Sequence, residues 1–271
     1  MSDHKPPRGE TVTVGEYQIH TLSYGSGPAV VFLHGSGPGA SAYSNFKLNI
    51  DAVVNTGHRA VLIDMIGFGY SSKPEECDYT TALFADTTKG AIDALGIEKC
   101  SLVGNSLGGA ICIRLALDYP EMVERLIMMA PGGIEEKETY FAMPGIAKMV
   151  SSFVDGGLDR DGLRNVLHTL VFDNSVVTDE LVEERYCILE NQPPEVLSRM
   201  IIPNMDVELK NIRCPVYGFW GEQDEMTPVS GAHKLLQSCQ DCQFTLLANC
   251  GHWVMVEHDQ LFNQHLSDIL S

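Results

Sequence analysis

The chain has 271 residues, of which 44% are hydrophobic and 20% charged, as in an ordinary globular protein. Its 36 acidic residues outnumber 18 lysines and arginines, and the net charge of −18 argues against a nucleic-acid or anionic-membrane partner. A chain of this length can fold without disulfides or a structural metal.

The sequence shows no sign of membrane insertion or export. Its longest apolar runs, at 29–33 and 126–130, span five residues, whereas a transmembrane helix needs about 20. The N-terminal residues lack the apolar stretch of a secretory signal. We therefore expect a cytoplasmic protein whose eight cysteines are reduced thiols, several of them buried.

In chain order, the predicted elements alternate between strands and helices. Residues 11–14 and 17–23 alternate apolar and polar side chains around a glycine, which favours a hairpin. Six short apolar runs follow, typical of strands buried on both faces of a parallel sheet. They lie at 29–33, 60–63, 100–103, 126–129, 216–220 and 244–247. Amphipathic stretches such as 81–95 lie between them, and this order predicts an α/β fold with a mostly parallel sheet.

Residues 133–205 interrupt that alternation, because they follow a helical pattern with charged segments and no strand runs. We interpret this stretch as a helical lid inserted into a core made of residues 1–132 and 206–271. The alternative is a long crossover, but connections between elements are normally short.

A candidate nucleophile lies directly after the predicted strand at 100–103. Residues 104–108 read G-x-S-x-G with Ser106 at the centre, and a helical pattern follows. This arrangement places a serine hydroxyl at a sharp strand-to-helix turn, and the small residues on either side let the two elements approach. The alternative is a glycine-rich turn that binds a ligand passively.

A serine nucleophile needs a histidine base and a carboxylate that orients it. His252 follows the last predicted strand, and we prefer it to His258 in the predicted final helix. Asp224 follows the strand at 216–220, with Glu222 as the second choice. The order Ser106, Asp224, His252 is that of α/β-hydrolases.

Two backbone N–H groups are expected to stabilise an oxyanion: that of Leu107, next to the nucleophile, and that of Ser36 in the glycine-rich loop at 34–40. The alternative role of such a loop is phosphate binding, but this loop lacks the lysine of a P-loop.

Cys239, Cys242, Cys250 and His252 also have a spacing that is compatible with zinc. A zinc ion would occupy the histidine that the serine needs, so we expect no metal. We likewise expect no cofactor.

Three motifs together resemble those of the meta-cleavage product hydrolases, which are carbon–carbon bond hydrolases of aromatic catabolism on the α/β-hydrolase fold. The motifs are LHGSGPGASAYSN at 33–45, GNSLGG at 104–109 and CGHWVMVEH at 250–258, supported by DMIGFGYS at 64–71. The resemblance covers nearly the whole chain. It implies hydrolysis of 2-hydroxy-6-oxohexa-2,4-dienoates to 2-hydroxypenta-2,4-dienoate and a carboxylic acid, and a homodimer or larger homo-oligomer.

The same resemblance implies that Arg185, in the predicted lid, binds the substrate carboxylate. A guanidinium suits this task in so acidic a protein, because it matches a carboxylate with two hydrogen bonds. The alternative is that Arg185 pairs with Glu184 or Glu190 on the surface of the lid.

Four further residues match family positions in the site: Asn45, Asn105 and Trp253 in its polar part, and Met226 at the leaving-side pocket, where relatives vary. Asn105 could instead be only part of the turn, and Trp253 only part of the core. The identity of the acyl substituent stays open. Two other functions are also open, a carboxylesterase on the same triad and a small-molecule receptor on a hydrolase fold.

Overall fold

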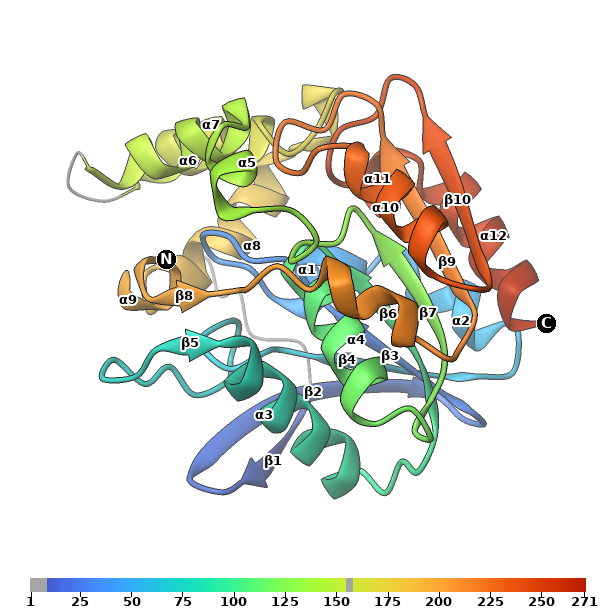
Figure 1. Cartoon of the computed structure of the whole chain (residues 1–271). Coiled ribbons are helices and arrows are strands. Elements are labelled where there is room, and N and C mark those ends of the chain that lie inside the picture. The colour runs from blue at the N-terminus through green and yellow to red at the C-terminus, as the bar shows by residue number, and fades with distance from the viewer. Residues whose placement is uncertain (1–8, 155–157) are drawn as a thin grey trace.

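The computed structural model describes residues 9–154 and 158–271 (Figure 1). An eight-stranded sheet has the order β1-β2-β4-β3-β6-β7-β9-β10. Its strands are β1 (Glu10–Val14), β2 (Tyr17–Gly25), β3 (Ala29–Leu33), β4 (Arg59–Ile63), β6 (Cys100–Asn105), β7 (Val123–Met129), β9 (Val216–Gly221) and β10 (Cys242–Leu247). Strand β2 is antiparallel to β1 and β4, and the other neighbours are parallel. The predicted α/β fold and its N-terminal hairpin are confirmed.

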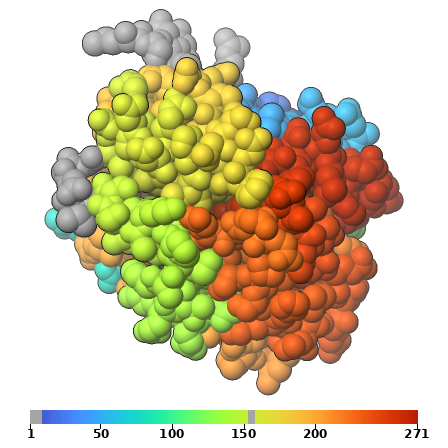
Figure 2. All heavy atoms as spheres, turned by 90° about the horizontal axis from the view of Figure 1, so that it is seen from above, coloured from blue at the N-terminus to red at the C-terminus, as the bar shows by residue number. Residues whose placement is uncertain are grey.

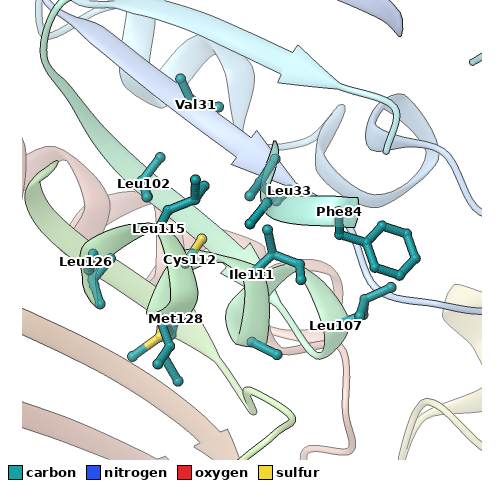
Figure 3. Packing of buried hydrophobic residues seen from close by; sticks show 14 of the residues in the cluster. Val31, Leu33, Phe84, Leu102, Leu107, Ile111, Cys112, Leu115, Leu126 and Met128 are labelled. Carbon is teal, nitrogen blue, oxygen red and sulfur yellow. The ribbon is translucent and has the colours of Figure 1, made fainter. Parts of the chain in front are cut away.

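Alternation along the strands divides the core between the two faces of the sheet. In β3, Val31 and Leu33 pack on one face, and Val30 and Phe32 on the other. The first face holds α3 (Thr81–Ala94), α4 (Leu107–Asp118), α10 (Ser230–Ser238) and the short helix η2 (Asp206–Asn211). The second holds α1 (Ala42–Phe46), α2 (Ile50–Val54), α11 (Val254–Glu257) and α12 (Asp259–Leu270). Figure 3 shows side chains of α4 packed against those of the central strands.

The chain between β7 and β9 forms a separate group of helices. They are α5 (Lys137–Phe141), α6 (Pro144–Val154), α7 (Arg160–His168), α8 (Asp179–Leu189) and α9 (Glu195–Ser198), with the short helix η1 (Asn174–Val176) before α8. Figure 1 shows α5, α6 and α7 grouped away from the helices that flank the sheet. Seen from above, the lime and yellow atoms of this segment cover one side of the molecule (Figure 2). We propose that α5–α9 are the lid of the site described below.

The expectation that residues 133–205 contain no strand is wrong at one place. Strand β8 (Met200–Ile201) pairs in parallel with β5 (Tyr79–Thr80), and the N–H of Tyr79 also bonds to the carbonyl of Arg199. A two-residue strand leaves no periodic pattern, and its partner lies far away in the sequence. This pairing joins the end of the helical segment to the core.

The eight cysteines are free thiols. Burial raises the pKa of Cys100 to about 12 and that of Cys112 well above its usual value, so both stay protonated at neutral pH. Within residues 9–154 and 158–271, we find no helix with the length and apolar character needed to cross a membrane.

Candidate active site

Ser106 lies in a strained turn between β6 and α4. Its φ of 54° falls in a region that residues other than glycine rarely occupy. The Ser106 N–H donates to the carbonyl of Met129 at 3.0 Å, and its carbonyl accepts the N–H of Gly132 at 2.9 Å, so the end of β7 and the residues after it hold the turn. A Cβ atom on Gly108 would lie 1.9 Å from the carbonyl oxygen of Leu33. Only glycine lets α4 approach β3 this closely, which explains why Gly108 stands two residues after the serine.

His252 and Asp224 meet at the same edge of the sheet. The Nδ1 atom of His252 lies 2.7 Å from Oδ2 of Asp224, and both side chains are buried. Asp224 also accepts the backbone N–H groups of Met226 and Thr227, at 2.7 and 2.9 Å, and the Thr227 hydroxyl at 2.8 Å. These bonds fix the carboxylate, so His252 presents Nε2 as its free ring nitrogen. Sequence reasoning missed Thr227, although its position three residues after an aspartate is typical of an Asx turn.

The two alternative candidates, Glu222 and His258, do not take part in the Asp224–His252 pair. Glu222 is exposed, and His258 lies between α11 and α12, where its Nε2 atom contacts the carbonyl of Asn249. No group of three or more His, Cys, Asp or Glu side chains is placed to hold a metal in the parts of the chain that the structure describes.

The loop that carries His252 is held by groups outside the predicted site. The His252 N–H donates to the carbonyl of Leu170, between α7 and α8, at 2.9 Å. Glu257 accepts the N–H groups of Gly251, Phe172 and Asp173 at 2.6–3.0 Å. Burial raises the pKa of Glu257 despite these bonds. Sequence reasoning assigned Glu257 no role, because two of its three partners, Phe172 and Asp173, lie far away in the sequence.

Ser106 and His252 line one cavity of about 130 Å³, together with Ser36, Leu107 and Met226. Leu107 is the first residue of α4, where helix N–H groups lack partners within the helix and the helix dipole favours negative charge. The cavity therefore brings the proposed nucleophile and base to the two predicted oxyanion-hole residues.

His34 positions the glycine-rich loop at 34–40. Its Nδ1 atom donates to the carbonyl of Gly35 at 2.8 Å, and its Nε2 atom accepts the N–H of Met65 at 3.1 Å. This pattern requires a neutral ring, and burial lowers the pKa of His34 accordingly. Sequence reasoning assigned His34 no role, because its partner Met65 lies in a distant loop.

Arg185 lies at the other side of the loop, in a polar cluster. Its Nε–H donates to the carbonyl of Pro38 at 3.1 Å, and Nη1 lies 3.4 Å from Oδ1 of Asn45. The amide of Asn45 in turn contacts Asn105 at 3.4 Å. The guanidinium lies 5.1 Å from the centre of the Trp253 ring. The structure thus brings together the four residues predicted for the polar end of the site.

The charge of Arg185 is buried, and among the described residues it forms no ion pair, although the charge of Glu184 partly opposes the effect of burial on its pKa. The residue is 1% exposed, and burial lowers its pKa to about 10, so it is still protonated at neutral pH. Glu184 pairs with Lys47 at 2.7 Å, and none of the ion pairs formed within the described part of the chain includes Arg185. A buried, unpaired guanidinium favours an anionic ligand, because burying a lone charge costs several kcal/mol.

Two glycines make room for this arginine. A Cβ atom on Gly39 would lie 1.9 Å from the carbonyl oxygen of Arg185, and one on Gly37 would lie 3.2 Å from its Nη2 atom. Gln192, which sequence reasoning missed, accepts the N–H of Gly39 at 2.8 Å. Helix α8 and the segment that follows it therefore contact the loop that carries Ser36.

Comparisons with known proteins agree on one family. A family model described as the alpha/beta hydrolase fold matches residues 28–171. A 2-hydroxy-6-oxononadienedioate/2-hydroxy-6-oxononatrienedioate hydrolase of Comamonas testosteroni is 36% identical over 96% of this chain and 95% of its own length. A 2-hydroxy-6-oxo-6-phenylhexa-2,4-dienoate hydrolase of Burkholderia cepacia is 34% identical, with the same coverage. Among solved structures, a meta-cleavage product hydrolase of Pseudomonas fluorescens IP01 superposes with a TM-score of 0.85 at 29% identity, over 96% of each chain.

Proposed function

The chain belongs to the meta-cleavage product hydrolases of the α/β-hydrolase fold, and we propose that it hydrolyses a carbon–carbon bond in 2-hydroxy-6-oxohexa-2,4-dienoates. Such compounds are ring-cleavage products of aromatic degradation. The products are 2-hydroxypenta-2,4-dienoate and a carboxylic acid. The observation that carries the proposal is the buried guanidinium of Arg185. It forms no ion pair among the described residues, and it donates to Pro38 in the loop that also carries Ser36.

Arg185 binds the carboxylate of the dienoate, and Asn45 and Asn105 contact its 2-hydroxy end. The contacts of Arg185 with Pro38 and Asn45 support this role, because they fix the guanidinium without neutralising it. The guanidinium of Arg185 lies over the face of the Trp253 ring, and this cation–π interaction stabilises its positive charge.

The substrate first takes up a proton at carbon 5 and becomes a ketone, so that the later leaving group is a stabilised enolate. His252 then removes the proton of Ser106 through Nε2, and the serine oxygen attacks the carbonyl at carbon 6. The backbone N–H groups of Ser36 and Leu107 donate to the resulting oxyanion. Asp224 holds the imidazole in the required tautomer and stabilises its protonated form.

The bond between carbons 5 and 6 then breaks, and its electron pair enters the enolate of the 2-oxo acid. The proton that His252 took from Ser106 passes to this enolate, which leaves as 2-hydroxypenta-2,4-dienoate and restores the neutral imidazole. The acyl group stays on Ser106 as an ester. His252 next deprotonates a water molecule, which hydrolyses the ester and releases the carboxylic acid. These steps use only side chains and backbone groups of this chain and water.

The arrangement around this site also supports a lid made of α5–α9, since Leu170 and Arg185 from that segment contact the loops of His252 and Ser36. A cytoplasmic location and a homo-oligomer remain parts of the proposal. Free, buried thiols support the first. Light scattering of the purified protein tests the second.

The direct test is the loss of visible absorbance of 2-hydroxy-6-oxo-6-phenylhexa-2,4-dienoate, with benzoate identified among the products. We expect many turnovers in the wild type and a kcat at least about 10³-fold lower in Ser106→Ala, because triad residues act as a unit. A Ser106→Ala variant that keeps more than a few per cent of kcat would show that another group is the nucleophile.

A further inference from the structure

The cavity at Ser106 has an apolar wall, and Arg185, Asn45 and Asn105 are not among the residues that line the cavity. The wall is formed by side chains of α5, α6, β8 and the turns beside them, namely Tyr140, Ile146, Met149, Met200, Ile202 and Met226. A dienoate with its carboxylate at Arg185 and its carbon 6 at Ser106 therefore extends its acyl substituent into this cavity.

The wall offers no positive charge to a substituent. Among the described residues that line the cavity there is no lysine or arginine. The hydroxyl of Tyr140 accepts the N–H groups of Ile134 and Glu135 at 3.1 and 3.3 Å, and it is a neutral group that carries no positive charge.

Two lysines on the elements around the cavity already have acidic partners, and a third, Lys137 on α5, is exposed and lies over the ring of Phe141. Lys148, on α6, pairs with Glu225 at 3.0 Å, next to the cavity residue Met226. Lys234, on α10, pairs with Glu135 at 2.7 Å and with Asp206 at 3.3 Å. A carboxylate at the end of an acyl chain would therefore meet the acidic partners of Lys148 and Lys234, and Lys137 is not among the residues that line the cavity.

We infer that this chain acts on dienoates whose acyl substituent is uncharged and apolar, about as large as one aromatic ring, and that it discriminates against substrates with a second carboxylate on the acyl side. The inference rests on the proposed function and narrows its substrate class. Both kinds of acyl group occur in the names of the similar proteins, so similarity alone does not choose between them.

The size of the cavity fits this class. An apolar cavity of about 150 Å³ is known to hold benzene, and this one measures about 130 Å³. Three of the six wall residues are methionines, whose unbranched, flexible side chains adapt to different apolar shapes. We therefore expect both alkyl and phenyl substituents to be accepted.

The test compares kcat/KM for three substrates: the 6-phenyl and 6-methyl 2-hydroxy-6-oxohexa-2,4-dienoates, and 2-hydroxy-6-oxonona-2,4-diene-1,9-dioate. We expect the two uncharged acyl groups to be preferred over the dioate by about 100-fold, because an unpaired carboxylate in an apolar cavity is strongly disfavoured. A preference below about tenfold, or a preference for the dioate, would overturn the inference while leaving carbon–carbon hydrolysis intact. Cleavage of none of the three would refute the proposed function itself, and the inference with it.

A charge placed on the cavity wall tests the assignment of this cavity. Met149→Lys adds a cation of similar length on α6, and we expect it to reduce the preference against the dioate at least about tenfold. Met149→Gln is the uncharged control, and Val150→Lys adds the same charge at the neighbouring, 47% exposed position. An unchanged preference in Met149→Lys, or an equal change in Val150→Lys, would contradict the placement of the acyl group here.

Discussion

At the scale of single residues, a second buried carboxylate–histidine pair supports the loops beside the site. Asp64 accepts the N–H groups of Ala42 and Tyr70 at 2.7 and 3.0 Å and lies 2.9 Å from Nδ1 of His20. Burial alone would raise the pKa of Asp64, but the hydrogen bond and charge of His20, with other contacts, hold it below its usual value. This carboxylate joins β2 and the start of α1 to the loop after β4.

We expect Asp64→Asn to lower the free energy of unfolding by about 2–4 kcal/mol, because the new amide group faces donors in a buried site. Urea unfolding at neutral pH measures the loss, with the exposed Asp86→Asn on α3 as control. Since the folded pKa is depressed, the contribution of Asp64 is complete at neutral pH and is lost as pH falls below about 3.8. Equal stability of the two variants at neutral pH would contradict the role given to Asp64.

The sequence predicts residues whose chemistry is local and misses those that act through distant contacts. Ser106 stands in a recognisable turn motif, and the order of Asp224 and His252 along the chain follows from the fold class. The supporting roles of His34, Asp64 and Gln192 depend on elements far apart in the sequence, so no spacing in the chain reveals them.

At the scale of elements, helix α8 and the residues after it are coupled to the loop that carries Ser36. Arg185 donates to the carbonyl of Pro38, and Gln192 accepts the N–H of Gly39. Gly39 has a φ of +63° and lies against the α8 backbone, so the loop has little freedom to move away. The sequence predicted both elements but not this contact, because it depends on tertiary packing.

We expect Gln192→Met, which keeps the length of the side chain but removes its acceptor, to lower kcat about 3- to 10-fold, because the loss of one hydrogen bond loosens the oxyanion loop. Gln192→Glu keeps an acceptor oxygen for Gly39 and should retain more of kcat. Steady-state kinetics and urea unfolding separate an effect on the loop from a loss of stability. Identical kcat values in the wild type and Gln192→Met would show that this contact does not position the loop.

At the scale of the whole molecule, the fold class followed from alternating apolar runs, whereas the small strand pair of β5 and β8 could not be predicted from so few residues.

The net charge of −18 is a second global property, and it opposes the approach of an anionic substrate over long distances. The buried cation at Arg185 acts only at short range.

We therefore expect kcat/KM for a dienoate to rise with ionic strength, about 2- to 5-fold between 10 and 200 mM salt, as screening shortens the range of the repulsion. A neutral aryl ester provides the control, because the net charge of the protein neither attracts nor repels a neutral molecule. If dienoate and ester respond equally to salt, the net charge does not govern substrate encounter.

The most direct test of the proposed function measures kcat/KM for 2-hydroxy-6-oxo-6-phenylhexa-2,4-dienoate and for a neutral aryl ester in the wild type and in Arg185→Gln. The two reactions share the serine, the histidine and an acyl-enzyme, and only the dienoate has a carboxylate for the guanidinium. We expect Arg185→Gln to lower kcat/KM for the dienoate at least about 100-fold. For the ester we expect a loss of no more than about tenfold, because the variant also removes the hydrogen bond to Pro38 in the oxyanion loop. An equal loss for both substrates, or no loss for the dienoate, would contradict the assignment of Arg185 as the group that makes this hydrolase specific for dienoates.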